Sequence, residues 1–364
     1  MKSSILTILD MALDRFIQDL KQIKPGHNGP YKDEETFVRV YSHWLVISSY
    51  LYFNTTDEKY KTFSYELINA LKSSNARPMG AAFFCRKNPQ KDFSNGLMGQ
   101  AWVMEALVYA SKIFDDVSLM NLAVDLYEMH YFDTNCSLWR VLNVDGSYND
   151  FDQTFNHQLW FAAIASKLNS DRAKEDSKSF VNNILMNVEL YQNGVIYHKS
   201  MLFKFNVEAK NGISAVISYL LNKLYSLRLK KSLYLKSVGY HGFNLVALCH
   251  LYSQFPNHKF FSSEKFKKII GVIKSDKYIS ELVKSKYSYQ YNPPGIEEAI
   301  ALTNFDAYLD INAAKIALFR HFSITGLSNS DVSDDFNTSL SRLYELTLIN
   351  WDCNVEFDVG GEDK

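Results

Sequence analysis

The chain has 364 residues, and its 39 Lys and Arg residues nearly balance its 40 Asp and Glu residues, giving a formal net charge of -1. So weak an overall field gives no reason to expect nucleic acid or an anionic membrane as a partner. Aromatic residues make up 15% of the chain, which suits a helical core of large side chains and equally an enzyme that stacks rings on sugars.

The first twenty residues lack the pattern of a secretory signal, because Asp10, Asp14, Arg15 and Asp19 interrupt their apolar positions. No later stretch approaches the roughly 18 continuous apolar residues that a membrane span needs. We therefore expect a cytoplasmic protein without stable membrane insertion. The four cysteines are widely spaced and form no CxxC or Cys/His set, so the sequence predicts neither a disulfide framework nor a zinc site.

Apolar positions recur at i, i+3, i+4 and i+7 along most of the chain, which predicts an almost wholly helical protein. The expected helices come in pairs, which in chain order are 3–22 with 35–52, 57–73 with 95–112, 116–130 with 153–168, 174–189 with 240–254, 262–276 with 295–303, and 308–323 with 334–348. One further helical segment, 209–228, falls inside the loop that connects the two helices of the fourth pair.

The two helices of a pair differ in composition. The first carries charged residues along one side, as in "SSEKFKKIIGVIK", which is typical of a solvent-facing outer helix. The second is richer in Trp, Gly, Ala and polar residues of the kind that are buried, as in "TFNHQLWFAAIA", which is typical of an inner helix. The loops that lead into the second helices are long, and long loops in compact domains are often functional.

Six such pairs predict an all-α protein, an (α/α)6 toroid of six inner and six outer helices whose long loops gather at one mouth. We expect a single domain over residues 1–350, with an insertion at about 190–235 and a C-terminal tail over 351–364. The alternative, an open solenoid of helical pairs, would need a more regular repeat length.

If the ring closes, the starts of the inner helices share one cavity, and polar side chains are concentrated there. Each of them alone could be a helix cap, an ion pair or a core group, but their convergence favours a site. The candidates for substrate contact are Arg39, His43, Asn95, Gln100, Trp102, Glu105, Trp160, His241 and Tyr291. The candidates for chemistry are Asp152, Asn156, His157, Tyr240 and Glu297.

At this point the chain resembles a known group of proteins. The stretches "NGLMGQAWVMEAL", "DQTFNHQLWFAA", "GYHGFNLVAL" and "YNPPGIEEA" are similar to the six-hairpin glycosidase-like toroids, and more closely to the VpsJ-like proteins of exopolysaccharide assembly. The likeness runs from about Gly29 to Glu345. It implies a role in surface-polysaccharide biosynthesis, with an oligosaccharide or polysaccharide substrate that could be lipid-linked, and a place in a glycan-assembly complex. Without GxGxxG, a P-loop or a His/Cys cluster, we expect no nucleotide or metal cofactor.

Two of these stretches are also similar to toroidal alginate lyases. That resemblance implies that Asn156 helps to neutralise a uronate carboxylate, that His157 removes the C5 proton, and that Tyr240 protonates the leaving oxygen. An epimerase that returns the proton would use the same three residues. The lyases carry an Arg shortly before the Tyr, whereas here the cations nearest upstream are Lys231 and Lys236.

Two other functions stay open. Glycoside hydrolysis needs two carboxyl groups across the sugar, for which Asp152 and Glu297 are the best pair, with Asn156 and His157 positioning the sugar. We place hydrolysis first because toroids at large are more often hydrolases, which is an argument from fold alone. A non-catalytic glycan-binding subunit would use the same aromatic residues, but binding does not require so many ionisable groups.

Overall fold

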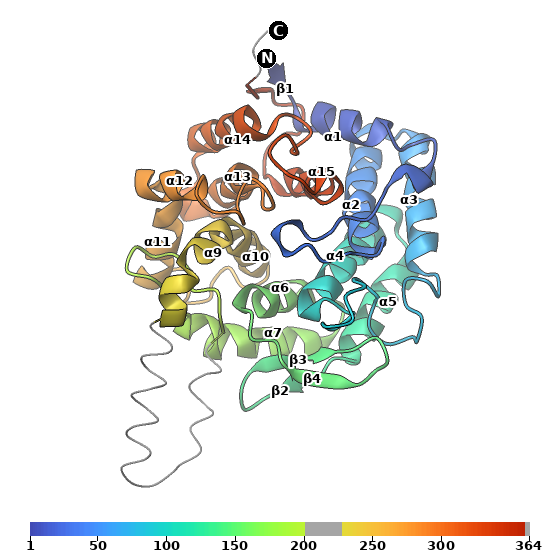
Figure 1. The fold of residues 1–364 in the computed structure, drawn as a ribbon, viewed down its shortest axis with the longest axis horizontal. Helices are drawn as coiled ribbons and strands as arrows, with labels where there is room; N and C mark the ends of the chain where they lie inside the picture. The colour runs from blue at the N-terminus through green and yellow to red at the C-terminus, as the bar shows by residue number, and fades with distance from the viewer. Residues whose placement is uncertain (201–227, 361–364) are drawn as a thin grey trace.

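The computed structural model describes residues 1–200 and 228–360. Its helices form two concentric layers around one axis (Figure 1). The inner helices are α2 (Val38–Thr55), α4 (Gly96–Phe114), α6 (Phe155–Ala165), α10 (His241–Gln254), α13 (Pro294–Asn304) and α15 (Phe336–Ser341). The outer helices are α1 (Ile5–Asp14), α3 (Glu58–Leu71), α5 (Val117–Glu128), α7 (Asp171–Asn183), α11 (Glu264–Gly271) with α12 (Asp276–Leu282), and α14 (Ile311–Thr325).

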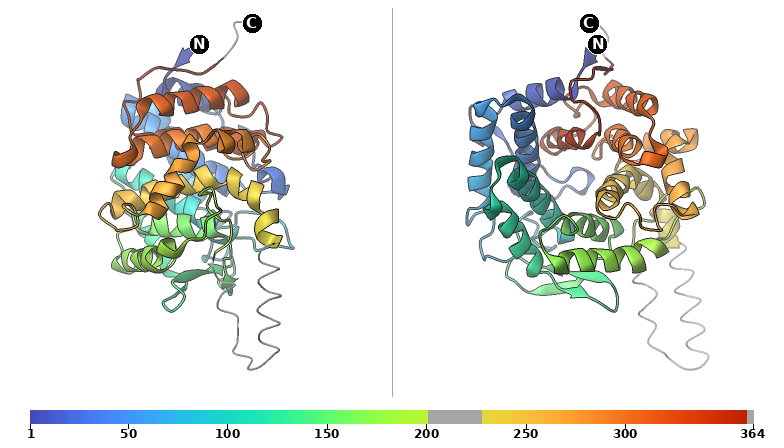
Figure 2. Two further views of the ribbon diagram at one scale, coloured as in Figure 1. Left: turned by 90° about the vertical axis from the view of Figure 1, so that its left-hand side faces the viewer. Right: turned by 180° about the vertical axis from the view of Figure 1, so that it is seen from behind.

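The inner helices close into a ring. In turn, α2 contacts α4, α4 contacts α6, α6 contacts α10, and α10 contacts α13. The 3₁₀ helix η7 (Arg342–Leu348) continues α15 and contacts both α13 and α2, which completes the circle. The ring is visible from both faces of the molecule (Figure 2). The predicted (α/α)6 toroid is confirmed.

The two layers begin their helices differently. Each outer position starts with a Ser or Asp whose side chain accepts a hydrogen bond from a backbone N–H of the first turn, which satisfies part of the helix end. These caps are Ser4, Asp57, Asp116, Ser170, Ser263 and Asp310. Of the inner helices, α2, α4, α6, α10 and α13 have no such side-chain cap. Side chains other than the capping residue bind some of these helix ends, since Asp92 accepts from the N–H of Gly96 and Asp152 accepts from the N–H of Leu97.

Several element boundaries differ from the sequence prediction. The first outer helix, expected over 3–22, ends at Asp14, and Phe16 then packs edge-on against Trp44 of α2 at 5.2 Å between ring centroids. The fifth, expected over 262–276, is divided into α11, a 3₁₀ turn and α12, and the division follows Gly271, a residue with low helix propensity. Tertiary packing and a local helix breaker thus override the apolar period at these two places.

A small sheet occupies the connection between α5 and α6. The sequence prediction has no strands in this connection. The strands β2 (Phe132–Asp133), β3 (Leu138–Leu142) and β4 (Tyr148–Phe151) are antiparallel, with Phe132 opposite Trp139 and Arg140 opposite Phe151. Gly146, at φ +85°, turns the chain between β3 and β4, as is usual for an Asp-Gly hairpin. Since β4 ends one residue before Asp152, the sheet positions a candidate site residue.

The remaining short elements lie near the chain ends and the inserted connection. The strand β1 (Lys2–Ser3) pairs antiparallel with β5 (Phe357–Asp358), which brings the two ends of the described chain together (Figure 1). The short helix α9 (Tyr234–Gly239) leads into α10. The helix expected over 209–228 lies, except for its last residue, outside the described residues. Within residues 1–200 and 228–360, no helix combines the length and apolar character that crossing a bilayer requires.

Candidate active site

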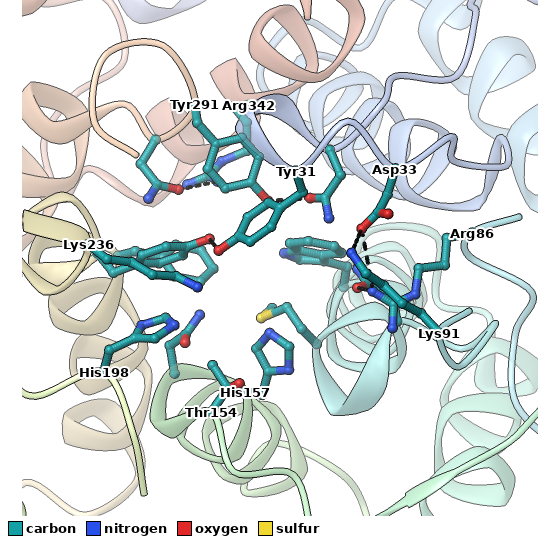
Figure 3. Close-up of a pocket in the computed structure, with 18 residues that line it drawn as sticks. Tyr31, Asp33, Arg86, Lys91, Thr154, His157, His198, Lys236, Tyr291 and Arg342 are labelled. Carbon is teal, nitrogen blue, oxygen red and sulfur yellow. Dashed lines mark hydrogen bonds and ion pairs between the residues drawn. The ribbon is translucent and has the colours of Figure 1, made fainter. Parts of the chain in front are cut away.

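A cavity lies where the long loops meet the N-terminal ends of α4, α6, α10 and α13. Its volume is about 630 Å³ when the open solvent at its mouth is included. The sequence-predicted site residues that line it are Asn95, Trp102, Asn156, His157, Tyr240 and Tyr291. Lining residues that the sequence did not single out include Asn28, Tyr31, Asp33, Arg86, Lys91, His198 and Arg342 (Figure 3).

His157, which lines this cavity, forms a hydrogen-bonded pair with Asp152, which lines a second cavity beside it. His157 is the one residue of α6 that is not buried, and its Nδ1 lies 2.7 Å from Oδ2 of Asp152. Because a carboxylate accepts from Nδ1–H, this contact assigns the lone pair of the neutral ring to Nε2. His157 therefore offers a base to the cavity while Asp152 fixes its orientation.

The N-terminal end of α4 holds the Asp152 carboxylate. The backbone N–H of Leu97 donates to Oδ2 at 3.3 Å, and that of Thr154 donates to Oδ1 at 3.0 Å. Burial raises the pKa of Asp152, but the His157 ring and these N–H groups outweigh burial, and the net pKa is lowered. Gly96, at φ +58°, allows the close approach, since a Cβ there would lie 2.4 Å from Oδ2 of Asp152.

A pair of tyrosines supplies a proton donor on another wall of the cavity. The hydroxyls of Tyr31 and Tyr240 lie 2.8 Å apart, and Figure 3 shows Tyr31 across the cavity from His157. Burial and the neighbouring Tyr31 raise the pKa of Tyr240 well above its ordinary value, so its hydroxyl keeps its proton at neutral pH. The ring of His198 packs against that of Tyr240, with 5.0 Å between the ring centroids. Burial and the charge of Lys236 hold the pKa of His198 well below its ordinary value.

The cavity lining carries more positive than negative charge. Among the described residues that line it, the cations are Arg86, Lys91, Lys236 and Arg342, against the carboxylate of Asp33. In the described parts of the chain, no group of three or more His, Cys, Asp or Glu side chains is arranged to hold a metal ion. Ion pairs offset most of this charge, because Arg86 and Lys91 pair with Asp33 and Arg342 pairs with Glu297, so Lys236 is the lining cation with no ion pair among the described residues.

Arg39 lies behind the lining and braces it. Its guanidinium stands 4.1 Å from the centroid of the Trp102 ring and donates to Asn28 at 3.2 Å and to the Tyr291 hydroxyl at 3.4 Å. It also pairs with Glu35 at 3.2 Å. Two nitrogens of Arg39 have no hydrogen-bond partner among the described residues. Arg39 thus orients two lining aromatics instead of facing the cavity itself.

Three other predicted contact residues, Gln100, Trp160 and His241, lie outside the cavity lining and bind backbone groups. The amide of Gln100 satisfies backbone groups in the loop before α4. The Trp160 indole donates to the carbonyl of Phe243 at 3.1 Å and stacks on the Phe243 ring. Both ring nitrogens of His241 bind backbone groups of neighbouring segments. The polar groups of these three side chains therefore hold helices and loops together in the interior by hydrogen bonds to backbone groups.

His43 and Glu105 lie deeper in the ring. The His43 ring stacks on Tyr344 at 4.3 Å between centroids, and its Nδ1 lies 3.2 Å from the hydroxyl of Ser341. Glu105 lies 3.1 Å from Nε2 of His250. Neither predicted contact residue lines the cavity at the mouth.

Glu297 is fully buried beside Arg342, with 3.0 Å between its Oε1 and Nη2 of the guanidinium. Burial and the nearby Glu345 raise the pKa of Glu297 well above its ordinary value. Glu297 lines neither the cavity at the mouth nor a second cavity that adjoins it, which is described below. The structure thus does not bring Asp152 and Glu297 to opposite sides of either cavity.

A second, more open cavity adjoins the first. Its volume is about 770 Å³ including open solvent, and the two cavities share Arg86, Thr154 and His157. It extends past Asn149 and Asp150 of β4. His157 therefore stands at the junction, where a ligand longer than one sugar would pass.

Apart from Arg342, which begins η7, the lining residues that sequence reasoning missed come mainly from loops. Tyr31 and Asp33 precede α2, Lys91 precedes α4, and His198 lies in the connection between α7 and α10. The expectation that long loops gather at the mouth points to these segments but not to particular residues, because irregular loops have no period. For His198, the available signal was a histidine within a long loop.

No protein-family model matches the chain. Archaeal glycosylation protein Q of Haloferax volcanii is 34% identical over 337 residues, which cover 89% of this chain and 91% of that protein. Such identity over nearly the full length of both proteins indicates common descent.

Three solved structures are similar in fold. Cellobiose 2-epimerase from Bacillus thermoamylovorans B4167 has a TM-score of 0.58 at 11% identity, over 94% of this chain and 98% of that one. D-mannose isomerase has a TM-score of 0.57 at 11% identity, over 94% and 95%. An alpha-1,6-mannanase of Salegentibacter sp. HEL1_6 has a TM-score of 0.53 at 11% identity, over 94% and 97%. They confirm the resemblance to six-hairpin toroids, while the likenesses to VpsJ-like proteins and alginate lyases stay predictions.

Proposed function

The chain belongs to the family of archaeal glycosylation protein Q, and from this premise we propose that it is a carbohydrate-active enzyme that epimerises a hexuronic acid residue of a glycan at C5. The name of its relative and the carbohydrate-active enzymes that share its fold support a carbohydrate-processing role. One observation carries the reaction type. The hydrogen bond of His157 Nδ1 to Asp152 leaves Nε2 as the ring nitrogen for the substrate, in a cavity that Lys236 and Arg342 also line.

The chemistry of a uronate fits these groups. Its C5 proton is α to the carboxylate, so removing that proton sends the electron pair into the carboxylate and forms an enediolate. His157 takes the proton on Nε2, while the Asn156 side chain and Arg342, both in the lining, stabilise the developing charge. Asp152 stabilises the imidazolium that results.

The return of a proton to the other face of C5 completes the epimerisation. The Tyr240 hydroxyl, which keeps its proton at neutral pH, supplies it. Its hydrogen bond to Tyr31 gives the resulting phenolate an immediate donor. His157 releases its proton to solvent and Tyr240 regains one, so the reaction consumes and produces no net proton.

The same three residues would serve elimination if the C4 oxygen departed with the Tyr240 proton. Hydrolysis by Asp152 and Glu297 has less support, because Glu297 is enclosed beside Arg342 and away from both cavities. A non-catalytic binding subunit would have no use for a base held in one tautomer. The products separate all four functions.

The test is product analysis in deuterated water. The purified protein is incubated with uronic-acid-containing oligosaccharides, and masses and C5 configurations are read by mass spectrometry and NMR. Epimerisation predicts inverted C5 centres that each carry one deuterium, with the chain length unchanged, and predicts no inversion with His157→Gln. Cleavage with gain of water, an unsaturated uronate, or no deuterium uptake from any uronate would each contradict the proposal.

A further inference from the structure

Among the described residues, Lys236 is the cation of the cavity lining that has no carboxylate partner. It lies on α9, and in the described chain no Asp or Glu forms an ion pair with it, whereas Arg86, Lys91 and Arg342 each have one. Its side chain is only partly exposed. The charge of Lys236 is therefore available to a ligand.

Other lysines gather around the same point. The Nζ of Lys236 lies 4.9 Å from the centroid of Tyr31 and 5.2 Å from that of Tyr287. Lys286 lies 5.3 Å from the Tyr287 ring. Burial and the charges of Lys199, Lys286 and Lys91 lower the pKa of Lys236 to about 8. We call Lys236, Lys199 and Lys286 the lysine rim.

The lysine rim is unfavourable without an anion. A partly buried ammonium loses hydration, nearby like charges add repulsion, and no Asp or Glu of residues 1–200 and 228–360 forms an ion pair with Lys236 to offset them. The Lys236 ammonium lies over the rings of Tyr31 and Tyr287, which give it a weaker electrostatic partner than a carboxylate would. An ammonium so placed at the edge of the cavity matches a sugar that carries an acidic substituent.

We propose that the lysine rim binds a phosphoryl group attached to the substrate sugar, in addition to the uronate carboxylate held near Arg342. The proposal rests on the proposed function, because that function supplies the sugar and its carboxylate. Several ammonium groups act as point charges and suit the oxygens of a phosphate, whereas a planar carboxylate is best matched by the fork of an arginine. The substrate would then be a glycosyl phosphate, carried by a lipid or by a nucleotide.

Calorimetry at pH 7 tests the subsite by comparing glucuronic acid 1-phosphate with glucuronic acid. We expect the phosphate to tighten binding by about tenfold or more in the wild type. Lys236→Gln should reduce that preference to about threefold or less, whereas Lys236→Arg should keep it. Lys277→Gln, which removes an exposed lysine of α12, is the matched control and should also keep it. An equal preference in the wild type and Lys236→Gln, or no preference in the wild type, would overturn the proposal.

Two further ligands identify the carrier, and a separate readout protects the proposed function. Tighter binding of a short polyprenyl-phosphate-linked glucuronic acid than of UDP-glucuronic acid indicates a lipid carrier, and the reverse order indicates a nucleotide. Deuterium uptake at C5 is measured in the same samples. Uptake without a phosphate preference overturns the lysine rim alone, whereas a phosphate preference without uptake from any uronate overturns the epimerase alone.

Discussion

In the described parts of the chain, two histidines of the inner helices pair with a carboxylate, and one of these two histidines lines a cavity. At the mouth, His157 Nδ1 lies 2.7 Å from Asp152, and deeper in the ring, His250 Nε2 lies 3.1 Å from Glu105. The two pairs differ in the partner of the other ring nitrogen. Nδ1 of His250 lies 2.6 Å from the Nζ of Lys167, whereas Nε2 of His157 is left for the cavity that His157 lines.

The comparison teaches that a paired histidine becomes a candidate base only where its other nitrogen is accessible. Burial and Lys167 lower the pKa of His250, and both of its nitrogens are engaged by side chains of the protein. Because Glu105 lies on α4, His250 on α10 and Lys167 just after α6, this pair joins three inner helices. The residue types are the same in both pairs, and the surroundings decide the role.

Replacing the two histidines should have the most different effects on the rate of exchange. His157→Gln should lower the rate of C5 deuterium exchange by about 10³-fold, because glutamine cannot accept the proton. His250→Gln should change that rate by less than about threefold, since the ring has no access to the cavity. Exchange rates measured by mass spectrometry on folded protein check both values. Equal losses in the two variants would mean that neither pair supplies the base.

A smaller effect is expected at the carboxylates. Asp152→Asn should keep the fold but lower the exchange rate by about 10²-fold, because an amide no longer fixes the tautomer or stabilises the imidazolium. The matched variant Glu105→Gln should leave the rate within about threefold of the wild type. Rates at several pH values, together with circular dichroism spectra, make the test. A full rate in Asp152→Asn would show that the carboxylate is only a support for α4.

The fold was largely predictable because its signal is periodic and repeated. Buried inner helices such as α6 and amphipathic outer helices such as α7 have different compositions, and their alternation alone indicated the toroid. The sheet was missed because β3 and β4 are short and lie in a connection, although Asp145–Gly146 is a hairpin signal. Helix ends shifted where a single contact, such as that of Phe16 with Trp44, turned the chain.

The candidate site was predictable in location more than in membership. A polar cluster at the start of α6 identified Asn156 and His157, which both line the cavity. The same reasoning could not separate them from Trp160, because a polar atom on an inner helix can satisfy a neighbouring backbone as readily as a ligand. His198 and the loop cations depend on how the loops fold over the mouth, which no local pattern specifies.

A smaller effect is expected on the pH dependence of the free energy of unfolding. The pKa of His250 is lowered in the folded protein, so below the unfolded value of about 6.5 the unfolded chain binds a proton that the folded chain does not. The contribution of His250 to the free energy of unfolding therefore falls as the pH drops from 7 to 5. His43, His130, His241 and His321, whose pKa values are also lowered, act in the same direction, whereas Glu297, Glu298 and Glu345, whose pKa values are raised, act in the opposite direction.

Removing His250 should take away only its share of this pH dependence. His250→Gln should lower the free energy of unfolding at pH 7 by about 1 to 3 kcal/mol, because Glu105 and Lys167 lose a buried partner. Between pH 7 and pH 5 the same variant should lose less stability than the wild type, by at most about 2 kcal/mol. Leu248→Val, a buried change on α10 without a titrating group, should be less stable at pH 7 but keep the wild-type slope. Urea unfolding at the two pH values measures all three proteins, and a wild-type slope in His250→Gln would mean that His250 is not held neutral by its enclosure, which would remove the physical contrast with His157.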